Sequence, residues 1–422
     1  MVPERANRIH LAAGSSTVGE LGDAFARRRL NDPALGEQPV AFACAGAEEA
    51  IGAAAALADR PFDALLLPLE RLTPDVLALL AAQGWGVQDA QGRLTRPARA
   101  ATAEPGRVTL LTSGTTGTPK LVPHRWETLF TLRRAGEARP MRWLLTYQSG
   151  TYAWFQMVTL ALFVRGQELV AGDEPDPAGL LALAAGQGAN AISSTPTFWR
   201  FALLTTDTAM LDALAFEQLT LGGERVDQAV LDQLHARFPR ARLSHIYAST
   251  EVGAAIVVHD GREGFPAAWM SPPDAPADPS AVQFRVEDGR LLVRSPYASP
   301  AGEGWVDTGD EVEHRGDRIL VTGRRGATLI NVGGLKVAPH AVEEVLLHHA
   351  DVAWCRVRGQ ASRLVGALVA ADVVLRPGAD AAAAEQALAR HAAAHLPEHA
   401  VPRLWTILDA IPMTGNRKSE VA

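Results

Sequence analysis

Lysine is rare in this chain, and the few lysines lie in segments whose composition suits anion binding. Only three of the 40 basic residues are lysines, at positions 120, 336 and 418. A lysine ammonium is a compact charge on a flexible stem, whereas an arginine guanidinium is a planar fork, so the two are not interchangeable. Lys120 ends a Gly/Thr-rich segment, Lys336 follows a glycine pair, and Lys418 closes Asn-Arg-Lys. A coding bias against lysine explains the scarcity, but the placement marks all three as candidates for chemistry.

The segment Thr112-Ser-Gly-Thr-Thr-Gly-Thr-Pro-Lys120 has the composition of a phosphate-binding loop. Its glycines free backbone N–H groups to surround phosphate oxygens, and its hydroxyls and single ammonium add further donors. The Walker A spacing GxxxxGK[ST] is absent, and a plain Ser/Thr-rich turn is the alternative interpretation. In full, and followed by Val-Pro-His124, the segment closely resembles the phosphate loop of the adenylate-forming superfamily. That superfamily includes acyl- and aryl-CoA synthetases and nonribosomal peptide adenylation domains.

Further motifs that resemble this superfamily follow in its order. Tyr247-Ala-Ser-Thr-Glu251 is similar to the motif whose threonine and glutamate hold phosphate and magnesium, with its aromatic residue near the adenine. A cation chelated by ATP prefers carboxylate oxygen, which suits Glu251. Gly222-Gly-Glu224 resembles the loop beside the adenine, where missing side chains allow close approach. Thr308-Gly-Asp310, by itself typical of a turn, resembles the ribose motif, in which one carboxylate accepts from both hydroxyls.

Two segments near the C-terminus also resemble family motifs, each with a departure. Gly323 to Pro339 is similar to the hinge and to the loop that enters the active site for thioester formation. An extra residue leaves open whether Arg324 or Arg325 contacts the ribose, and the hinge position is weakly defined. Lys336 lies near the thiol side of that loop, or forms a surface ion pair. Ile411 to Lys418 is similar to the motif that carries the adenylation lysine, with Arg417 in place of the usual glycine.

The resemblance implies an enzyme that activates a carboxylic acid with ATP and Mg²⁺. The acid attacks the α-phosphorus, giving an acyl-adenylate and pyrophosphate, and the acyl group then passes to a thiol of coenzyme A or of the phosphopantetheine on an acyl carrier protein. The implied catalytic residues are Lys418, Glu251 and Thr250, with Glu251 also the metal ligand. The implied ATP-binding residues are Thr112, Ser113, Gly114, Thr115, Thr116, Gly117, Lys120, Gly222, Gly223, Glu224, Tyr247, Ala248, Ser249, Asp310, Arg324 and Arg325.

The acid itself is less well defined. The segments that resemble the substrate pocket are 147–156 and 193–199, and the substrate-binding candidates are Thr151, Tyr152, Phe155, Thr195 and Phe198. The aromatic side chains suit a flat ring, although such clusters are more often part of a core. We expect an aryl acid rather than a medium-chain fatty acid. The histidine that relatives often place near Thr151 or Tyr152 is missing, and so is an acidic residue for an amino acid's amino group.

Strand–loop–helix units must position these motifs. Apolar runs at 64–67, 107–112, 219–221 and 243–247 predict strands that open into polar loops, which is typical of parallel sheets with ligands at the carboxyl ends of strands. Short alternating runs at 282–286 and 290–294 predict a β-rich part. We predict an α/β protein with a large N-terminal domain (1–322), whose first subdomain is shortened relative to the family, and a small mobile α+β lid domain (323–422). The lid contains helices near 339–348 and 381–395 and a strand near 352–357.

Composition narrows the remaining possibilities. The 422-residue chain has a formal net charge of −7, so no basic field favours nucleic acid. It shows no signal peptide and no apolar run long enough to span a bilayer, which predicts a cytoplasmic protein. Two distant cysteines give no disulfide framework, and Pro397 interrupts the helix that would align His391, His395 and His399 on a metal. The alternatives left open are transfer to an amine and a catalytically silent nucleotide-binding scaffold.

Overall fold

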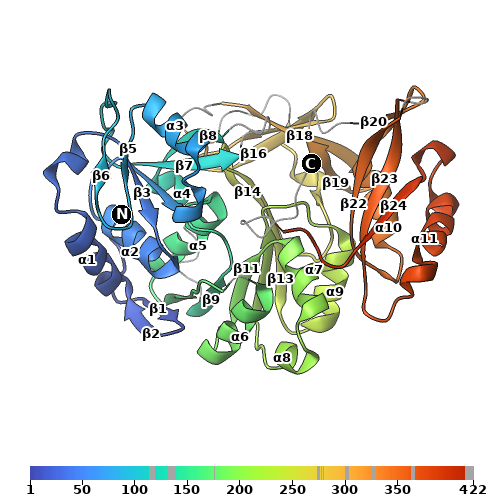
Figure 1. Cartoon of the computed structure of the whole chain (residues 1–422), viewed down its shortest axis with the longest axis horizontal. Coiled ribbons are helices and arrows are strands. Elements are labelled where there is room, and N and C mark those ends of the chain that lie inside the picture. The colour runs from blue at the N-terminus through green and yellow to red at the C-terminus, as the bar shows by residue number, and fades with distance from the viewer. Residues whose placement is uncertain are drawn as a thin grey trace.

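The computed structural model describes residues 1–113, 119–131, 139–174, 176–272, 276, 278, 280–299, 304–324, 329–362 and 366–413 (Figure 1). Two α/β layers form the N-terminal part, an antiparallel sheet lies beside them, and a smaller α/β unit stands at the right of the view. The α/β class predicted from the sequence is confirmed. The described β19 (Arg318–Arg324) ends near the predicted boundary at 322/323, which stays a prediction.

The largest sheet among the described residues has eight strands and carries most of the predicted motifs at one edge. Its inner strands pair in parallel, and only the two outermost strands run antiparallel to their neighbours. In spatial order the strands are β14 (Gly253–Val258), β13 (Arg242–Ser249), β12 (Gln218–Gly222), β11 (Ala191–Ser194), β9 (Met141–Leu145), β10 (Gln167–Val170), β1 (Arg8–Leu11) and β2 (Gly14–Thr17).

A second sheet, with six described strands, carries the phosphate-loop segment on its last hairpin. Its central strands are fully buried apolar runs that pair in parallel, as parallel sheets covered on both faces require. In spatial order they are β6 (Leu94–Thr95), β5 (Gly86–Gln88), β3 (Val40–Cys44), β4 (Ala64–Pro68), β7 (Arg107–Ser113) and β8 (Pro119–Arg125). The strands predicted at 64–67, 107–112, 219–221 and 243–247 are thereby confirmed.

Helices cover these sheets, and their first residues explain where they begin. Thr17 forms a capping box with Glu20, and Thr73, Asp176, Thr195 and Asp227 each accept a hydrogen bond from the first turn that follows them. The N-terminal helices are α1 (Val18–Arg29), α2 (Ala47–Ala58), α3 (Pro74–Ala82), α4 (Trp126–Leu129), α5 (Tyr152–Phe163), α6 (Pro177–Gln187), α7 (Pro196–Thr205), α8 (Thr208–Asp212) and α9 (Gln228–Arg237).

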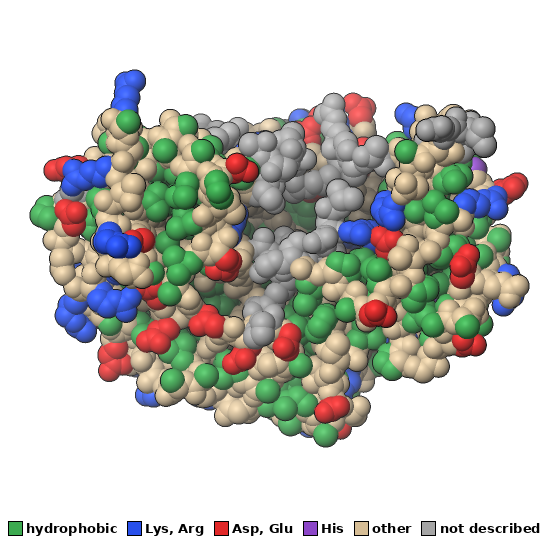
Figure 2. All heavy atoms as spheres, in the orientation of Figure 1, with side chains coloured by type: hydrophobic (Ala, Val, Ile, Leu, Met, Phe, Trp, Pro, Cys, Tyr) green, Lys and Arg blue, Asp and Glu red, His purple; other side chains and the backbone are tan. Residues whose placement is uncertain are grey.

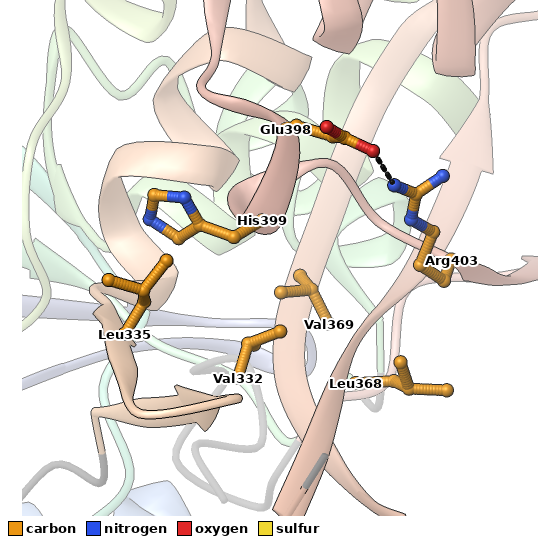
Figure 3. Close-up of a pocket in the computed structure, with 7 residues that line it drawn as sticks. All are labelled: Val332, Leu335, Leu368, Val369, Glu398, His399 and Arg403. Carbon is orange, nitrogen blue, oxygen red and sulfur yellow. Dashed lines mark hydrogen bonds and ion pairs between the residues drawn. The ribbon is translucent and has the colours of Figure 1, made fainter. Parts of the chain in front are cut away.

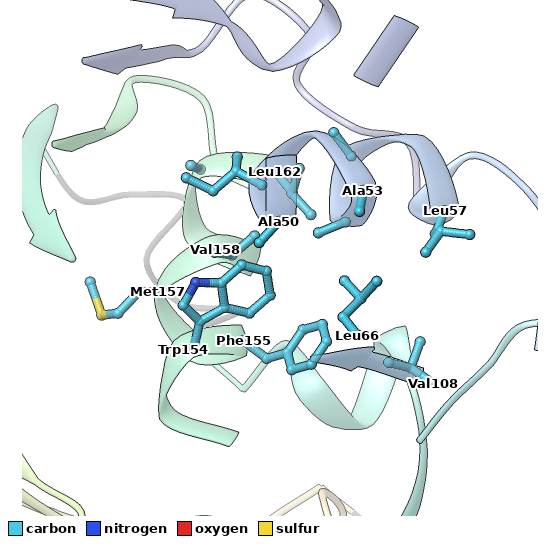
Figure 4. Close-up of a cluster of buried hydrophobic side chains, with 14 of the residues drawn as sticks. Ala50, Ala53, Leu57, Leu66, Val108, Trp154, Phe155, Met157, Val158 and Leu162 are labelled. Atoms are coloured by element: carbon cyan, nitrogen blue, oxygen red, sulfur yellow. The ribbon is translucent and has the colours of Figure 1, made fainter. Parts of the chain in front are cut away.

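The main core lies where α2 and α5 pack between the two sheets (Figure 4). The alanine-rich face of α2 lets α1 approach closely, since a Cβ at Gly52 would lie 2.8 Å from the Leu21 carbonyl oxygen. Trp154 and Phe155 of α5 meet at 4.9 Å between ring centroids in an edge-to-face contact and are fully buried. This rigid core fixes the loop before α5, which leads directly from the edge of the large sheet.

The remaining strands form an antiparallel sheet and the C-terminal unit. The antiparallel sheet comprises β15 (Phe265–Pro266), β19, β18 (Val306–Arg315), β17 (Arg290–Arg294) and β16 (Gln283–Glu287). The C-terminal unit comprises β20 (Ile330–Val332), β21 (Leu335–Val337), α10 (Pro339–Leu347), β22 (Val352–Ser362), β23 (Gly366–Leu375), α11 (Ala381–His395) and β24 (Leu404–Leu408). The strands and helices predicted in these two parts are confirmed, and β22 extends five residues beyond its predicted end.

The C-terminal unit contacts the N-terminal part through α7 and the loop after β12. Trp354 and Ile411 pack with Phe201 and Leu204 of α7. Glu344 of α10 bridges two arginines, with 3.5 Å to Arg225 and 2.7 Å to Arg315. This contact combines a small apolar cluster with ion pairs.

The charge pattern of one face and the lengths of the described helices bear on binding to nucleic acid and to membranes. On the face shown in Figure 2, Lys and Arg side chains are scattered among Asp and Glu rather than gathered in one patch. Across the described part of the chain, no helix combines the length and the apolar character that crossing a bilayer requires.

Candidate active site

The predicted nucleotide motifs meet at the carboxyl-end edge of the large sheet. Gly222 ends β12 directly beside Ile246 of β13, so the glycine pair and the Tyr247 motif leave the sheet side by side. Ser194 ends β11 beside Leu221 in the same way. Three strands thus deliver loop residues to one place, as expected for ligand sites of parallel sheets.

The β7–β8 hairpin carries both ends of the phosphate-loop segment. Thr112 pairs with Lys120 and Ser113 with Pro119, so the two ends of the loop lie opposite each other. Lys120 is exposed, which leaves its ammonium available to an anion. The predicted phosphate donors Gly114, Thr115, Thr116 and Gly117 lie outside the described residues.

The aromatic residue predicted near the adenine contacts the carboxylate predicted to bind the ribose. The Tyr247 hydroxyl donates a hydrogen bond to Asp310 Oδ2, although the two residues are 63 positions apart. Asp310 is only 6% exposed and lies in register with Arg324 on the neighbouring strand. The Asp310 backbone N–H donates to the Thr308 hydroxyl over 3.2 Å, which holds the Thr-Gly-Asp turn in shape. The structure therefore brings two predicted ATP-binding segments together.

The segment from Ala248 to Glu251 consists of the end of β13 and the turn that leads back into β14, and it is fixed through its backbone. The Thr250 carbonyl accepts a hydrogen bond from His124, and the Glu251 carbonyl accepts one from the Ser299 N–H over 2.9 Å. The Glu251 side chain is exposed, and Ser249 is half-buried. No group of three His, Cys, Asp or Glu side chains in the described ranges is arranged to hold a metal ion. A single exposed carboxylate fits a Mg²⁺ ion that takes its other ligands from ATP and water.

The two glycines shape the backbone at the end of β12, whereas the Glu224 side chain contacts the first turn of α7. Gly223 has a φ of +81°, a conformation that favours glycine, and a Cβ at Gly222 would lie 3.9 Å from the Tyr147 hydroxyl. The Glu224 carboxylate accepts hydrogen bonds from the N–H and the hydroxyl of Thr197, at 3.0 and 3.1 Å. It is therefore turned towards the start of α7, and it helps to hold that helix against the loop.

The structure places two predicted acid-binding residues in the core. Phe155 and Phe198 have no exposed surface. Phe155 packs edge-to-face against Trp154 (Figure 4), and Phe198 packs in the same way against Trp199. With no exposed surface, neither ring lines a pocket in this structure, so the burial does not support this part of the prediction. Burying a large aromatic side chain in the core instead stabilises the fold. The alternative interpretation of the aromatic cluster as core applies to both.

The other three acid-binding candidates occupy helix starts at the site's edge. Thr151 caps α5 and accepts from the Trp154 N–H over 3.3 Å, while the buried Thr195 caps α7 and accepts from the Phe198 N–H over 3.0 Å. Tyr152 is 7% exposed, and its hydroxyl accepts from the Ala254 N–H over 3.0 Å. Burial raises the pKa of Tyr152. These residues shape the loops around the site through capping and backbone contacts.

His124 contacts the Thr250–Glu251 segment, and the sequence alone assigned it no role of its own. It is fully buried on β8, with its Nε2 atom 2.7 Å from the Thr250 carbonyl oxygen and Nδ1 3.0 Å from the Thr128 hydroxyl. Burial lowers its pKa from 6.5 to about 4, so the ring is neutral at neutral pH. The only available signal was its place directly after the phosphate-loop segment.

Two of the residues predicted in the C-terminal segments, Lys418 and Arg325, lie outside the described residues. Lys336 is exposed on β21, opposite Asn331. His391 lies with Nε2 3.0 Å from the Val345 carbonyl oxygen, a hydrogen bond that joins α11 to α10. Since a carbonyl only accepts, His391 acts here as a donor in the packing of two helices.

A groove lies on the C-terminal unit (Figure 3). It has a volume of about 300 Å³ and lies between the β20–β21 hairpin and the segment after α11. At its rim Glu398 and Arg403 form an ion pair of 3.3 Å. Two of its lining residues, Val332 and Leu335, belong to the predicted hinge and thioester-loop segment (Gly323 to Pro339), and the others lie outside the predicted motifs. The lining residues are Val332, Leu335, Leu368, Val369, Glu398, His399 and Arg403.

Comparison with known families agrees with this arrangement. Residues 50–296 match the AMP-binding enzyme family, and residues 341–418 match the AMP-binding enzyme C-terminal domain. Since the first match covers more than half of the chain, this protein belongs to the AMP-binding, adenylate-forming enzyme family.

Individual relatives are distant in sequence. Pyochelin synthase PchD of Pseudomonas aeruginosa (strain UCBPP-PA14) is 27% identical over 336 residues, covering 72% of this chain and 60% of that protein. A salicylyl-CoA synthase / salicylate adenylyltransferase of a Streptomyces species is 25% identical, covering 73% of this chain and 60% of the relative. The chain thus spans about 60% of the length of these relatives.

The fold is shared with solved structures. The anthranilate CoA ligase AuaEII in complex with anthranoyl-AMP superposes with a TM-score of 0.75 at 17% sequence identity, covering 98% of this chain and 93% of that chain. At this identity the likeness shows the fold alone. It confirms the predicted combination of large N-terminal parallel sheets with a smaller C-terminal part.

Proposed function

We propose that this protein activates a carboxylic acid with ATP, forming an acyl-adenylate and releasing pyrophosphate. The observation that carries the proposal is that three chain segments bring predicted ATP-binding residues to one place, and that the His124–Thr250 hydrogen bond ties the β7–β8 hairpin of the second sheet to them. The β7–β8 hairpin brings Lys120, the β12 end brings the glycine pair, and the β13–β14 loop brings Glu251. Asp310 joins them through Tyr247. In this order, the residues would contact the triphosphate, the adenine, the Mg²⁺ ion that accompanies ATP, and the ribose.

In the proposed reaction the protein supplies position and charge rather than a covalent intermediate. The acid's carboxylate oxygen attacks the α-phosphorus, a new O–P bond forms, and the bond to the bridging oxygen of pyrophosphate breaks. Three anionic groups must be held together, so donors aimed at the phosphates lower the barrier. Mg²⁺ bound with ATP would neutralise phosphate charge next to Glu251. Lys418 would bridge the carboxylate and the α-phosphate, carried by a C-terminal lid domain of residues 323–422.

We propose an aryl acid as the substrate and coenzyme A as the acceptor, in the cytoplasm. One sequence relative supports this choice, since it is a salicylyl-CoA synthase / salicylate adenylyltransferase. A carrier-protein thiol or an amine would accept the same acyl-adenylate. The choice of acceptor rests on this similarity and on the resemblance of the Lys336 segment to the family's thioester-forming loop.

ATP–pyrophosphate exchange tests the adenylation step directly. The wild type and Lys418→Ala are compared across a panel of aryl, short-chain and amino acids. We expect exchange with aryl acids and a loss of about 10²–10³-fold in the variant, which is typical when one preorganised donor is removed. Exchange that is equal in both proteins would overturn the role of Lys418. No exchange with any acid would overturn the proposed function.

The acceptor is tested in the same mixture once an acid is known. Coenzyme A is added, and the products are separated by liquid chromatography with mass detection. We expect an acyl-CoA that requires both ATP and the acid. An acyl-adenylate that persists with coenzyme A, but disappears when an amine is added, would replace the thiol by an amine as acceptor.

A further inference from the structure

His124 links the two halves of the candidate triphosphate site. It lies on β8, the strand that Lys120 also occupies, and its Nε2 atom is 2.7 Å from the Thr250 carbonyl oxygen. Because a carbonyl oxygen only accepts hydrogen bonds, Nε2 must carry the hydrogen. This bond joins the six-stranded sheet to the eight-stranded sheet across 126 positions of the chain.

The surroundings of His124 keep the ring in one orientation. Nδ1 lies 3.0 Å from the Thr128 hydroxyl, the imidazole has no exposed surface, and its centroid lies 5.7 Å from that of Tyr152. Burial favours the neutral ring, which donates through Nε2 alone. The ring therefore has one fixed donor, and that donor points at the loop.

The Thr250–Glu251 loop is held from three directions while its carboxylate stays open. Besides the His124 bond, Ser299 donates to the Glu251 carbonyl, and Tyr152 accepts from the Ala254 N–H at 3.0 Å. A Cβ at Gly253 would lie 3.0 Å from the Tyr152 hydroxyl, so the chain just after Glu251 is closely packed. No side-chain contact fixes the exposed Glu251 carboxylate within the described residues, so its position follows from that of the backbone.

We propose that His124 is a positioning residue that locks the Thr250–Glu251 loop to the strand of Lys120, and so sets the separation between the metal-binding carboxylate and the phosphate-binding ammonium. This inference rests on the proposed adenylation function. His124 touches no reacting atom and acts through the Thr250 carbonyl. Its effect should therefore appear in turnover and in the Mg²⁺ requirement, and not in the affinity for the acid.

The chain offers a matched pair of variants. In His124→Gln the amide nitrogen is as many bonds from the backbone as Nε2, so the donor to Thr250 is kept. In His124→Asn the amide nitrogen corresponds to Nδ1, so that donor is lost. Both variants remove the ring and replace it with the same chemical group, which makes their packing losses comparable.

The test measures ATP–pyrophosphate exchange, the Mg²⁺ concentration for half-maximal rate, the KM of the acid, and thermal unfolding in the three proteins. We expect His124→Asn to lower kcat about tenfold or more and to raise the Mg²⁺ requirement, with the acid KM unchanged. His124→Gln should stay within about threefold of the wild type. A tenfold change corresponds to about 1.4 kcal/mol, within the range for a lost hydrogen bond next to a charged site.

The outcomes separate this inference from the proposed function. Equal losses in both variants, in step with equal drops in unfolding temperature, would mean that His124 only packs, and would overturn the inference. If the wild type shows no exchange, the proposed function fails, and MgATP binding by calorimetry decides instead. Weaker MgATP binding in His124→Asn than in His124→Gln then supports the positioning role; equal binding, or none in the wild type, overturns it.

Discussion

The loop edge of the large sheet and the contact of the C-terminal unit are built from different interactions. At the loop edge, neutral buried bonds such as His124 to Thr250 and Tyr152 to Ala254 hold the backbone in place. At the C-terminal contact, Glu344 meets two arginines whose side chains are 26% and 46% exposed. Buried bonds are insensitive to salt, whereas partly exposed ion pairs are weak and screened. The difference indicates that rigidity is built into the nucleotide edge and that the C-terminal unit is attached more loosely.

The largest expected loss of stability comes from adding a Cβ at Gly253, just after the Thr250–Glu251 loop. In Gly253→Ala the new Cβ would lie 2.7 Å from the Tyr297 Cβ, at a φ of +79°. Overpacking and backbone strain together should lower the free energy of unfolding by about 3 kcal/mol or more. Urea denaturation measures this change.

Gly261→Ala is the matched control for that variant. Gly261 has a φ of +72°, but nothing lies within 4 Å of a Cβ built there. We expect only the backbone cost, about 1 kcal/mol. Equal losses of stability in the two variants would show that the chain just after Glu251 is not tightly packed. This result would contradict the rigidity of the nucleotide edge.

The next effect is a pH dependence that comes from His124. Its pKa is lowered by burial from 6.5 to about 4, so between these values the unfolded state binds a proton that the folded state does not. Stability therefore falls as pH drops through this window, by about 2 kcal/mol at pH ~4.5, and is retained above it. In His124→Gln this part of the pH dependence should vanish. Urea denaturation of both proteins at several pH values gives the difference in their free energies of unfolding. If the two free energies change in parallel with pH, the result would contradict the burial of a neutral ring.

Removing the Tyr247 hydroxyl should have a smaller effect, confined to the nucleotide. In Tyr247→Phe the Asp310 carboxylate loses a donor. We expect the KM for ATP to rise about tenfold, which corresponds to about 1.4 kcal/mol. Preference for ATP over 2′-deoxy-ATP should change as well, because Asp310 is predicted to bind the ribose. A change in stability without a change in this preference would show that Asp310 does not bind the ribose.

The smallest effect is expected at the C-terminal contact. Glu344→Gln removes the charge that bridges Arg225 and Arg315. The loss should be under about 1 kcal/mol at low salt and should disappear near ~1 M salt. Glu313→Gln, which removes only the 3.3 Å pair with Arg315, is the control. A loss at Glu344 that is large and independent of salt would show that this contact is as rigid as the loop edge.

Much of the fold could be predicted, because apolar runs and polar loops are local signals. The strand before the phosphate loop and the glycine pair after β12 follow directly from such patterns. Long-range contacts leave no local pattern, and so the pairing of His124 with Thr250 and of Tyr247 with Asp310 needed the structure. The burial of Phe155 and Phe198 could not be predicted, because a sequence shows that aromatic residues gather but not which way they point. Both side chains are 0% exposed, which places them in the core.

The central claim is that this protein cleaves ATP between the α- and β-phosphates when an acid is present. Identifying the nucleotide product tests it most directly. The protein is incubated with ATP, Mg²⁺ and an aryl acid, and the nucleotides are separated by chromatography with mass detection. The account predicts AMP, pyrophosphate and an acyl-adenylate that all depend on the acid. ADP formation, or AMP formation that does not depend on the acid, would contradict it.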